Sequence, residues 1–577
     1  MKNDFKHFAL WILCCLIISK LYVSAQPPNE RNTFVPPVDV PLYLTSNYGE
    51  IREAHFHSGI DFLAETGSKV YAIKEGYVSR IAVTLNGYGK AVYIAHPNGY
   101  TSVYGHLSEF MPEIEKYVKD QQYQRRKYVI NLYPEADKFP VLQGQIIAFS
   151  GNTGYSFGPH LHFEIRDSRG AIPLNVLTFD FPVADSRTPR ITCLGIYPIN
   201  PHAQVDGTPN KVIIPLKNNN GNKYSIPGPV KVWGDIGFGI ETYDYLDGRE
   251  NMCSPFSVSL VVDDKLKNSF ELDRISFGKS SYVNSHIDYA EKVSNGRKIQ
   301  KLFVDPNNKL DIYKGMINNG ICTFTDSLEH KVSVQVKDVA GNQASLDFHV
   351  ISSFDEKIPS DAVHPHYADS FYYNTVNVYE TEQVKIALPN GALFTHIDFR
   401  YKAEKAADTL FSALHHVHEE STPVHGTYMI SIKPVNLPQA LSSKAIIVMI
   451  DNKDKISSTG GHYKNGYVTS RAGSFGRFAI FVDTMPPEIN PVSFVSKKKY
   501  TTHQIISFRI KDDLSGIGTY NGFIDGKWAL FEFDAKNDLL FYRPDASRLQ
   551  QNKEHTLELI ITDRKDNIRK FKGRFYF

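Results

Sequence analysis

From residue 36 to about residue 180, short runs of β-branched and aromatic residues alternate with glycine and asparagine turns. Asn86-Gly87 and Asn98-Gly99 are typical of the tight turns of β-hairpins. The pattern predicts an antiparallel sheet, in which side chains two residues apart face the same side. The strands are expected over residues 70–73, 76–83, 90–96, 101–106 and 145–150.

One segment of this region departs from the strand pattern. Between residues 108 and 127, Met111, Ile114 and Val118 recur at helical spacing with charged residues between them. This periodicity predicts an inserted amphipathic helix. We expect it to pack over the sheet; a wall or lid beside a cleft is the alternative.

After residue 180 the alternating pattern continues and shows a weak internal repeat. Residues 332–336 alternate into an Asp/Gly/Asn turn at 338–342, as residues 557–561 do into a turn at 563–567. The segments 185–191 and 483–489 also resemble each other. Alternation that ends in such a turn indicates a half-buried strand and its hairpin. The repeat predicts immunoglobulin-like β-sandwiches at about 186–355 and 486–577.

A third β-unit is predicted between these sandwiches, at 365–485, after a proline-containing linker at 353–367. The fold class is therefore mainly β: an N-terminal antiparallel sheet domain at 36–180 with an inserted helix, followed by β-sandwich domains. Such sandwiches more often position or dock a partner than catalyse. Spacers, wall-binding modules and contacts to an envelope protein are the alternatives.

Composition excludes some classes of function and supports this division. The 577 residues are too many for one hydrophobic core and suggest about four domains. With 64 basic and 62 acidic residues, the chain has no charge excess that would indicate nucleic-acid binding. Aromatic residues make up 12% of the chain, which favours β-structure.

The N-terminus has the pattern of a signal peptide at residues 1–25. Lys2 and Lys6 precede an apolar run at 8–18, and a small-residue cleavage site ends at Ala25. An uncleaved anchor is the alternative, although the run is shorter than the ~20 residues of a spanning helix. We expect a soluble chain exported to the periplasm or cell envelope. Outside the leader, Cys193, Cys253 and Cys322 allow one disulfide or none.

The candidate chemistry lies in histidines of the first domain. His160 and His162 are two residues apart on a predicted strand, so they face one cleft. His57, Asp61 and His106 lie upstream. A hydrolytic zinc site takes three nitrogen or oxygen ligands and keeps one position for water. His57, Asp61 and one of the two strand histidines supply such a set, which leaves two histidines free to move protons.

Four ordered motifs then carry a family resemblance. HSGID at 57–61, YGHLS at 104–108, GNTG at 151–154 and GPHLHFE at 158–164 resemble the lysostaphin-like or LytM-type zinc endopeptidases of family M23. The resemblance implies that His57, Asp61 and His162 bind zinc and that His106 and His160 are the catalytic pair. Glu164 either orients a ligand or is a structural carboxylate. The insertion at 109–142 departs from the family pattern.

The resemblance implies an exported zinc metalloendopeptidase that cuts peptide bonds in peptidoglycan, in its cross-links or stem peptides. Its partners are then the peptidoglycan peptide and, through the β-sandwiches, an envelope protein. One alternative is a non-catalytic activator of another cell-wall hydrolase, and a second is a peptidase that acts on surface proteins. His415, His416 and His418 also cluster, but the pattern around them indicates a surface loop more than a second metal site.

Overall fold

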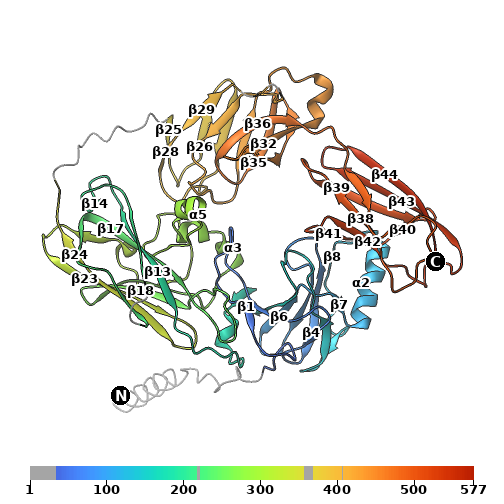
Figure 1. Ribbon diagram of the computed structural model, residues 1–577, viewed down its shortest axis with the longest axis horizontal. Helices are drawn as coiled ribbons and strands as arrows, with labels where there is room; N and C mark the ends of the chain where they lie inside the picture. Colours follow the sequence, from blue (N-terminus) through green and yellow to red (C-terminus); the bar gives the residue numbers. More distant parts are fainter. Residues whose placement is uncertain (1–33, 170, 218–220, 356–367, 406, 408) are drawn as a thin grey trace, which may run out of the picture.

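The computed structural model describes residues 34–169, 171–217, 221–355, 368–405, 407 and 409–577. The predicted leader at 1–25 and most of the predicted linker at 353–367 lie outside these residues. The predicted mainly-β fold is confirmed, with four β-rich units that follow one another around a ring (Figure 1). No helix in the described ranges is long and apolar enough to cross a membrane.

The first unit is built on a large antiparallel sheet. Its strand order is β1 (Leu44–Ser46), β2 (Ile60–Phe62), β11 (Leu161–Asp167), β6 (Tyr100–Gly105), β5 (Lys90–Ala95), β4 (Gly76–Val83) and β8 (Ile130–Leu132). At its margins, β12 (Ile172–Leu174) pairs with β11 and β9 (Pro140–Val141) pairs with β4. A smaller sheet contains β3 (Lys69–Tyr71), β10 (Ile146–Phe149) and β7 (Glu109–Phe110).

The inserted helix is present as α2 (Pro112–Arg125). Proline at the first helical position suits a helix start, because its missing N–H would have no partner there. Ile114 and Val118 are buried, while Lys116 between them is exposed and Glu115 is half-buried at the junction with the fourth unit. The helix ends where Arg126 adopts a left-handed backbone conformation with φ 49°.

The second unit packs against the first over a shared apolar core. Its main strands are β13 (Arg190–Pro198), β17 (Val230–Tyr243), β18 (Ser257–Val262), β19 (Lys265–Glu271), β23 (Glu329–Lys337) and β24 (Gln343–Ser352). The short helices α3 (Phe277–Ser280), α4 (Val283–His286) and α5 (Tyr289–Asn295) follow β19. The buried Tyr48 of the first unit and Leu272 of the second belong to one apolar cluster. Cys193, Cys253 and Cys322 are buried free thiols.

The third unit has two five-stranded antiparallel sheets and its own core. One sheet contains β26 (Asn377–Glu380), β27 (Val384–Leu388), β31 (Tyr428–Ile432), β35 (Tyr467–Ala472) and β34 (His462–Lys464). The other contains β29 (Tyr401–Glu404), β30 (Leu414–Val417), β36 (Gly476–Val482), β32 (Ala445–Ile450) and β33 (Ile456–Gly460).

The interpretation of the histidine cluster as a surface loop is wrong for His415 and His416. His415 and His416 lie on strand β30, which pairs with β29 and β36. The His415 side chain is fully buried and its Nδ1 atom is 2.8 Å from the hydroxyl of Tyr401. Two consecutive histidines on a strand face opposite sides of the sheet, which is why the doublet does not form a joint cluster.

The fourth unit has two four-stranded sheets and returns to the first unit. The sheets are β37 (Glu488–Pro491), β38 (Ile506–Lys511), β42 (Leu539–Tyr542) and β41 (Glu532–Asp534), and β40 (Lys527–Ala529), β39 (Ile517–Ile524), β43 (Glu554–Asp563) and β44 (Ile568–Tyr576). This unit lies beside α2 in Figure 1, so the last unit of the chain closes the ring on the first.

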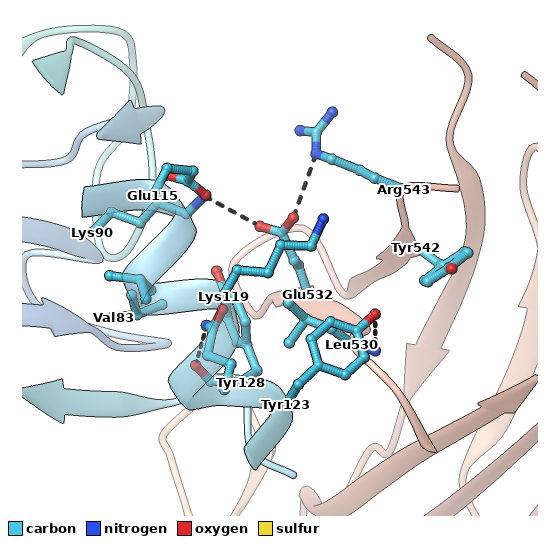
Figure 2. A pocket seen from close by; sticks show the side chains of 12 residues that line it. Val83, Lys90, Glu115, Lys119, Tyr123, Tyr128, Leu530, Glu532, Tyr542 and Arg543 are labelled. Atoms are coloured by element: carbon cyan, nitrogen blue, oxygen red, sulfur yellow. Dashed lines mark hydrogen bonds and ion pairs between the residues drawn. The ribbon is translucent and has the colours of Figure 1, made fainter. Parts of the chain in front are cut away.

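The closing contact combines charged and aromatic side chains. Lys119 of α2 forms an ion pair with Asp545 at 2.7 Å, and the rings of Tyr123 and Trp528 meet edge to face at 5.5 Å. Figure 2 shows the pocket at this junction, where Glu532 lies between Lys90 and Arg543. The insertion thus carries the surface on which the C-terminal unit of the same chain rests.

Candidate metal centre and catalytic site

Three neighbouring strands of the first sheet bring the predicted site residues together. In the β2–β11 ladder Asp61 lies opposite His162, and in the β6–β11 ladder Gly105 lies opposite His162. His106 directly follows β6, and His57 lies three residues before β2. The register of three strands therefore places residues far apart in sequence around one point.

Gly59 of the HSGID motif allows this approach. A Cβ atom at position 59 would lie 2.3 Å from the carbonyl oxygen of Phe163 and 2.8 Å from Cγ of Glu164. Real Cβ atoms do not come so close to backbone, so any larger residue would push the segment that carries His57 away from β11.

Three side-chain atoms converge at the centre of the site. Asp61 Oδ1 lies 2.9 Å from His162 Nδ1 and 3.2 Å from His57 Nε2, and the two histidine nitrogens are 3.1 Å apart. All three residues are buried, with 3–8% of their surface exposed. His57, Asp61 and His162 are thus the members of the predicted set that the structure brings within contact of one another.

Hydrogen bonds on the outer side of each ring fix which nitrogen faces inward. His57 Nδ1 is 2.8 Å from the carbonyl oxygen of Asn47, and His162 Nε2 is 2.9 Å from Glu164 Oε1. Because both partners only accept, these outer nitrogens carry the protons and donate them. The inner nitrogens and Asp61 Oδ1 are therefore three acceptors that face one another and require a positive charge between them.

The pKa values of His162 and Asp61 also show that a positive charge is required between the three atoms. Burial opposes a charge on His162, but its hydrogen bonds to Asp61 and Glu164 outweigh the effect of burial and raise the pKa of His162 to about 9. Likewise, despite burial, His57 and His162 hold the pKa of Asp61 well below its usual value. In the metal-free chain a proton supplies the positive charge, which a metal ion can replace.

This donor set fits zinc. Two nitrogens and one carboxylate oxygen are ligands that zinc prefers, and tetrahedral ligands at ~2.0–2.1 Å from the ion lie about 3.3 Å from each other. The three observed separations of 2.9–3.2 Å are close to that spacing. Three protein ligands also leave one position open, as in catalytic rather than structural zinc sites.

Glu164 is the centre of a buried network that holds His162. Its side chain is fully buried and accepts hydrogen bonds from Ser58 at 2.6 Å and Tyr88 at 2.5 Å, and from Arg166 Nε at 2.6 Å. The Tyr88 ring also stacks on His162 with centroids 5.0 Å apart. Despite burial, Arg166 and His162 hold the pKa of Glu164 well below its usual value, so it is a carboxylate.

His106 and His160 form a second pair beside this centre. Their ring centroids are 4.7 Å apart, and His160 Nε2 is 3.6 Å from Asp61 Oδ1. His106 Nδ1 donates to the carbonyl oxygen of Thr153 at 2.8 Å, and His160 Nδ1 donates to that of Gly158 at 2.9 Å. Each ring therefore has its Nε2 atom available as a proton acceptor.

Both rings of this pair are neutral. Burial and then the nearby rings of His162 and His160 lower the pKa of His106 to about 3, and burial lowers the pKa of His160. His106 also has a left-handed backbone conformation with φ 60°, which is uncommon for a residue other than glycine and often marks a functional position.

Several supporting residues were not identified from the sequence. Thr153 of the GNTG motif holds the His106 loop, because its hydroxyl donates to the carbonyl of Leu107 at 2.9 Å and accepts from the backbone N–H of Lys90 at 2.9 Å. Asn47 positions His57 through its backbone carbonyl oxygen. Tyr88 and Arg166 carry no motif of their own: Tyr88 lies in the turn between β4 and β5, and Arg166 lies on β11 itself, two residues after Glu164.

Two exposed aromatic residues flank the pair on the same loop. Tyr155 is 61% exposed and Phe157 is 90% exposed, and their rings meet edge to face at 5.1 Å. Both lie between the GNTG segment that holds His106 and the segment that carries His160. Large exposed rings beside a buried polar site are suited to contact a bound ligand.

Comparisons with known proteins match two parts of the chain to family models. Residues 55–123 match the model of peptidase family M23, and residues 368–483 match that of the Zu5-like domain. The chain is 33% identical over 130 residues to an uncharacterized metalloprotease of Haemophilus influenzae, a match that covers 22% of each protein. It is also 33% identical over 158 residues to the peptidoglycan DD-endopeptidase ShyA of Vibrio cholerae, covering 26% of this chain and 30% of that protein.

Among solved structures, a mutant catalytic domain of the prophage-encoded M23 protein EnpA from Enterococcus faecalis aligns with 29% identity and a TM-score of 0.18. That alignment covers 23% of this chain and 87% of the EnpA domain. The chain spans less than a third of the length of the two curated relatives.

Proposed function

We propose that this chain, whose N-terminal unit carries a peptidase family M23 domain, is a zinc-dependent endopeptidase that hydrolyses peptide bonds in peptidoglycan. The observation that carries the proposal is the convergence of His57 Nε2, Asp61 Oδ1 and His162 Nδ1 to within 3.2 Å of one another. Beside these three atoms lie two neutral histidines whose orientation is fixed.

His57, Asp61 and His162 hold the zinc ion in this proposal. Bound zinc lowers the pKa of a water molecule toward ~7 and polarises a carbonyl oxygen. The chain itself supplies orientation: Asn47 holds the His57 ring and Glu164 holds the His162 ring, each through the outer nitrogen. Such outer contacts keep the inner nitrogens deprotonated toward the ion.

His106 and His160 handle protons in this proposal. Both rings are neutral and carry their proton on Nδ1, where the carbonyls of Thr153 and Gly158 hold it. Nε2 of either ring can therefore accept a proton from the attacking water and later return it to the amine that leaves. The same pair can steady the charge that develops on the carbonyl oxygen of the substrate.

Peptidoglycan as the substrate is supported by the relatives. The Vibrio cholerae protein that matches over 158 residues is a peptidoglycan DD-endopeptidase. Tyr155 and Phe157 provide an exposed apolar surface next to His160 where a bound peptide can lie. Export to the periplasm or cell envelope, through the predicted leader, places the enzyme where this substrate is found.

We further propose that the C-terminal β-units position the catalytic unit, with 186–355 and 486–577 as immunoglobulin-like sandwiches around the third unit. Lys536 of the fourth unit donates to the carbonyl oxygens of Asn152 and Gly154 in the GNTG segment. The last unit therefore touches the loop that holds His106. An envelope protein that binds these units can then act on the catalytic loop.

Digestion of purified sacculi tests the proposal. The zinc-loaded chain is incubated with sacculi and the muropeptides are separated by chromatography. The proposal predicts the loss of cross-linked dimers or the shortening of stem peptides. An unchanged muropeptide profile with zinc bound would favour instead an activator of another hydrolase or a peptidase of surface proteins.

A further inference from the structure

Three aspartates converge in the second unit, away from the histidine site. Asp185 lies in the segment that leads into β13, Asp244 directly follows β17, and Asp338 directly follows β23. One carboxylate oxygen of each residue lies within 4.8 Å of those of the other two. The cluster joins three segments that are far apart in sequence and carries three negative charges when ionised.

Arg187 is a basic side chain near this cluster, but burial raises the pKa values of Asp185 and Asp244 by more than the charge of Arg187 lowers them. Within the part of the chain that the structure describes, no lysine or arginine forms an ion pair with any of the three aspartates. Arg187, which is close in sequence, pairs with Glu250 at 2.9 Å. The hydrogen bonds to the cluster come from neutral groups, such as both nitrogens of Asn342 to Asp338 at 2.8 Å.

Asp244 provides an observation that is independent of the cluster's charge. Its side chain is 2% exposed, and its buried Oδ1 atom accepts no hydrogen bond from any residue that the structure describes. A buried oxygen that lacks a donor costs about 1–3 kcal/mol, and more when it is charged. Burial and then the carboxylates of Asp185 and Asp338 raise the pKa of Asp244 to about 8.

We propose that Asp185, Asp244 and Asp338 bind a divalent cation, Ca²⁺, at the junction between the first and second units. The donors are all carboxylate oxygens, which suit hard cations and not zinc. Calcium–oxygen distances of 2.3–2.6 Å place oxygens on opposite sides of the ion about 5 Å apart, so a spread of up to 4.8 Å fits around one ion.

The same arrangement recurs where the third unit joins the fourth, so the aspartate cluster is a repeated feature of the chain. Asp483, Asp512 and Asp563 also lie within 4.8 Å of one another. In the first cluster Asn342 Nδ2 donates to Asp338 at 2.8 Å and to the backbone oxygen of Asp185 at 3.4 Å. In the second, Asn567 Nδ2 donates to Asp563 at 2.7 Å and to the backbone oxygen of Asp483 at 3.0 Å.

A cation in the first cluster would brace the segment that supports the histidine site. Asp244 forms a two-way backbone bridge with Cys253 at 2.8–2.9 Å. The next residue, Ser254, exchanges two hydrogen bonds of 2.8 Å with the buried side-chain amide of Asn47. The backbone carbonyl oxygen of Asn47 in turn holds the His57 ring. The proposal stands on the aspartates alone and does not require the chain to be a hydrolase.

Calcium content of the full-length chain tests the proposal. The zinc-loaded chain is dialysed against about 1 mM CaCl₂, the range in which extracellular calcium modules bind. Calcium per chain is then measured by mass spectrometry in the wild type and in Asp244→Asn and Asp338→Asn. Asp264→Asn is the matched control, because Asp264 is an exposed aspartate of the same unit that lies outside the cluster.

We expect the wild type and Asp264→Asn to hold one more calcium equivalent than Asp244→Asn and Asp338→Asn. Calcium should also raise the melting temperature of the wild type more than that of the two cluster variants. An unchanged circular dichroism spectrum verifies folding, and Asp338→Asn gives the result if Asp244→Asn does not fold. A wild type without calcium, or equal calcium in all four proteins, overturns the proposal.

Discussion

The contribution of Glu164 to the metal centre can be tested by the substitution Glu164→Gln. Glutamine keeps the shape of the side chain and one acceptor oxygen but removes the negative charge. In the wild type, Oε1 accepts from His162, Ser58 and Tyr88, while Oε2 accepts from Arg166. If the amide oxygen replaces Oε1, the amide nitrogen faces Arg166, and two donors then oppose each other.

The expected magnitude follows from burial. Glu164 is fully buried and Arg166 is 7% exposed, so the substitution leaves a buried arginine without its carboxylate. Removal of one partner from a buried ion pair costs about 3–5 kcal/mol. Loss of the charge also weakens the hold on His162 Nε2, and loss of such outer contacts typically lowers metal affinity 10–100-fold. We expect both a lower melting temperature and weaker zinc binding.

Zinc affinity is measured by competition with a chromophoric chelator, and folding by circular dichroism and calorimetry. Glu113→Gln is the matched control, because Glu113 is an exposed carboxylate in α2 of the same unit. The control should keep both the affinity and the melting temperature of the wild type. Unchanged zinc affinity in folded Glu164→Gln would refute the role of this residue in holding His162.

Three further predictions concern the same unit. Since a proton must leave His162, whose pKa is about 9 without metal, the apparent zinc affinity should fall about tenfold for each pH unit lost below about 8; pH-independent affinity would contradict the proposed ligand set. Phe157→Ala should raise KM about 3–10-fold with kcat retained, because it removes an aromatic contact worth about 1 kcal/mol. Tyr133→Ala, in the insertion, is the control and should leave both KM and kcat unchanged. Equal KM in the two variants would exclude Phe157 from the peptide-binding surface. Gly59→Ala should lower the melting temperature and the zinc content, because the added Cβ would lie 2.3 Å from the carbonyl oxygen of Phe163. Gly158→Ala is the control, because a Cβ at position 158 has open space around it and should be tolerated. Equal stability of the two variants would mean that β2 and β11 do not need their close approach.

Local patterns sufficed for much of the first unit. The predicted strand at 76–83 coincides with β4 (Gly76–Val83), and the helix predicted within 108–127 is α2 (Pro112–Arg125), because alternation and helical spacing reflect burial directly. Spacing alone could not decide between His160 and His162, since residues two apart share a face. The cross-strand pairing of Asp61 with His162 places His162 nearer than His160 to Asp61, and such pairing is a long-range property.

Contacts between units were beyond sequence analysis for the same reason. Asn47 and Ser254 are 207 residues apart, and nothing in either local sequence indicates that they exchange hydrogen bonds. The sequence shows the repeat of Asp185 in Asp483 as similar segments, and that of Asp338 in Asp563 as similar turns. Their convergence with a third aspartate in each unit depends on the packing of three loops. The polar residues around His415 indicated a loop, whereas its side chain is fully buried on a strand.

The most direct test of the metal centre compares zinc content and peptidoglycan hydrolysis in the wild type, His162→Ala and His106→Ala. His162 contributes one of the three converging atoms, whereas His106 lies beside them. We expect that the wild type binds zinc and is active, that His162→Ala loses both, and that His106→Ala keeps zinc but is inactive. Zinc retained by folded His162→Ala, or full activity in His106→Ala, would contradict it.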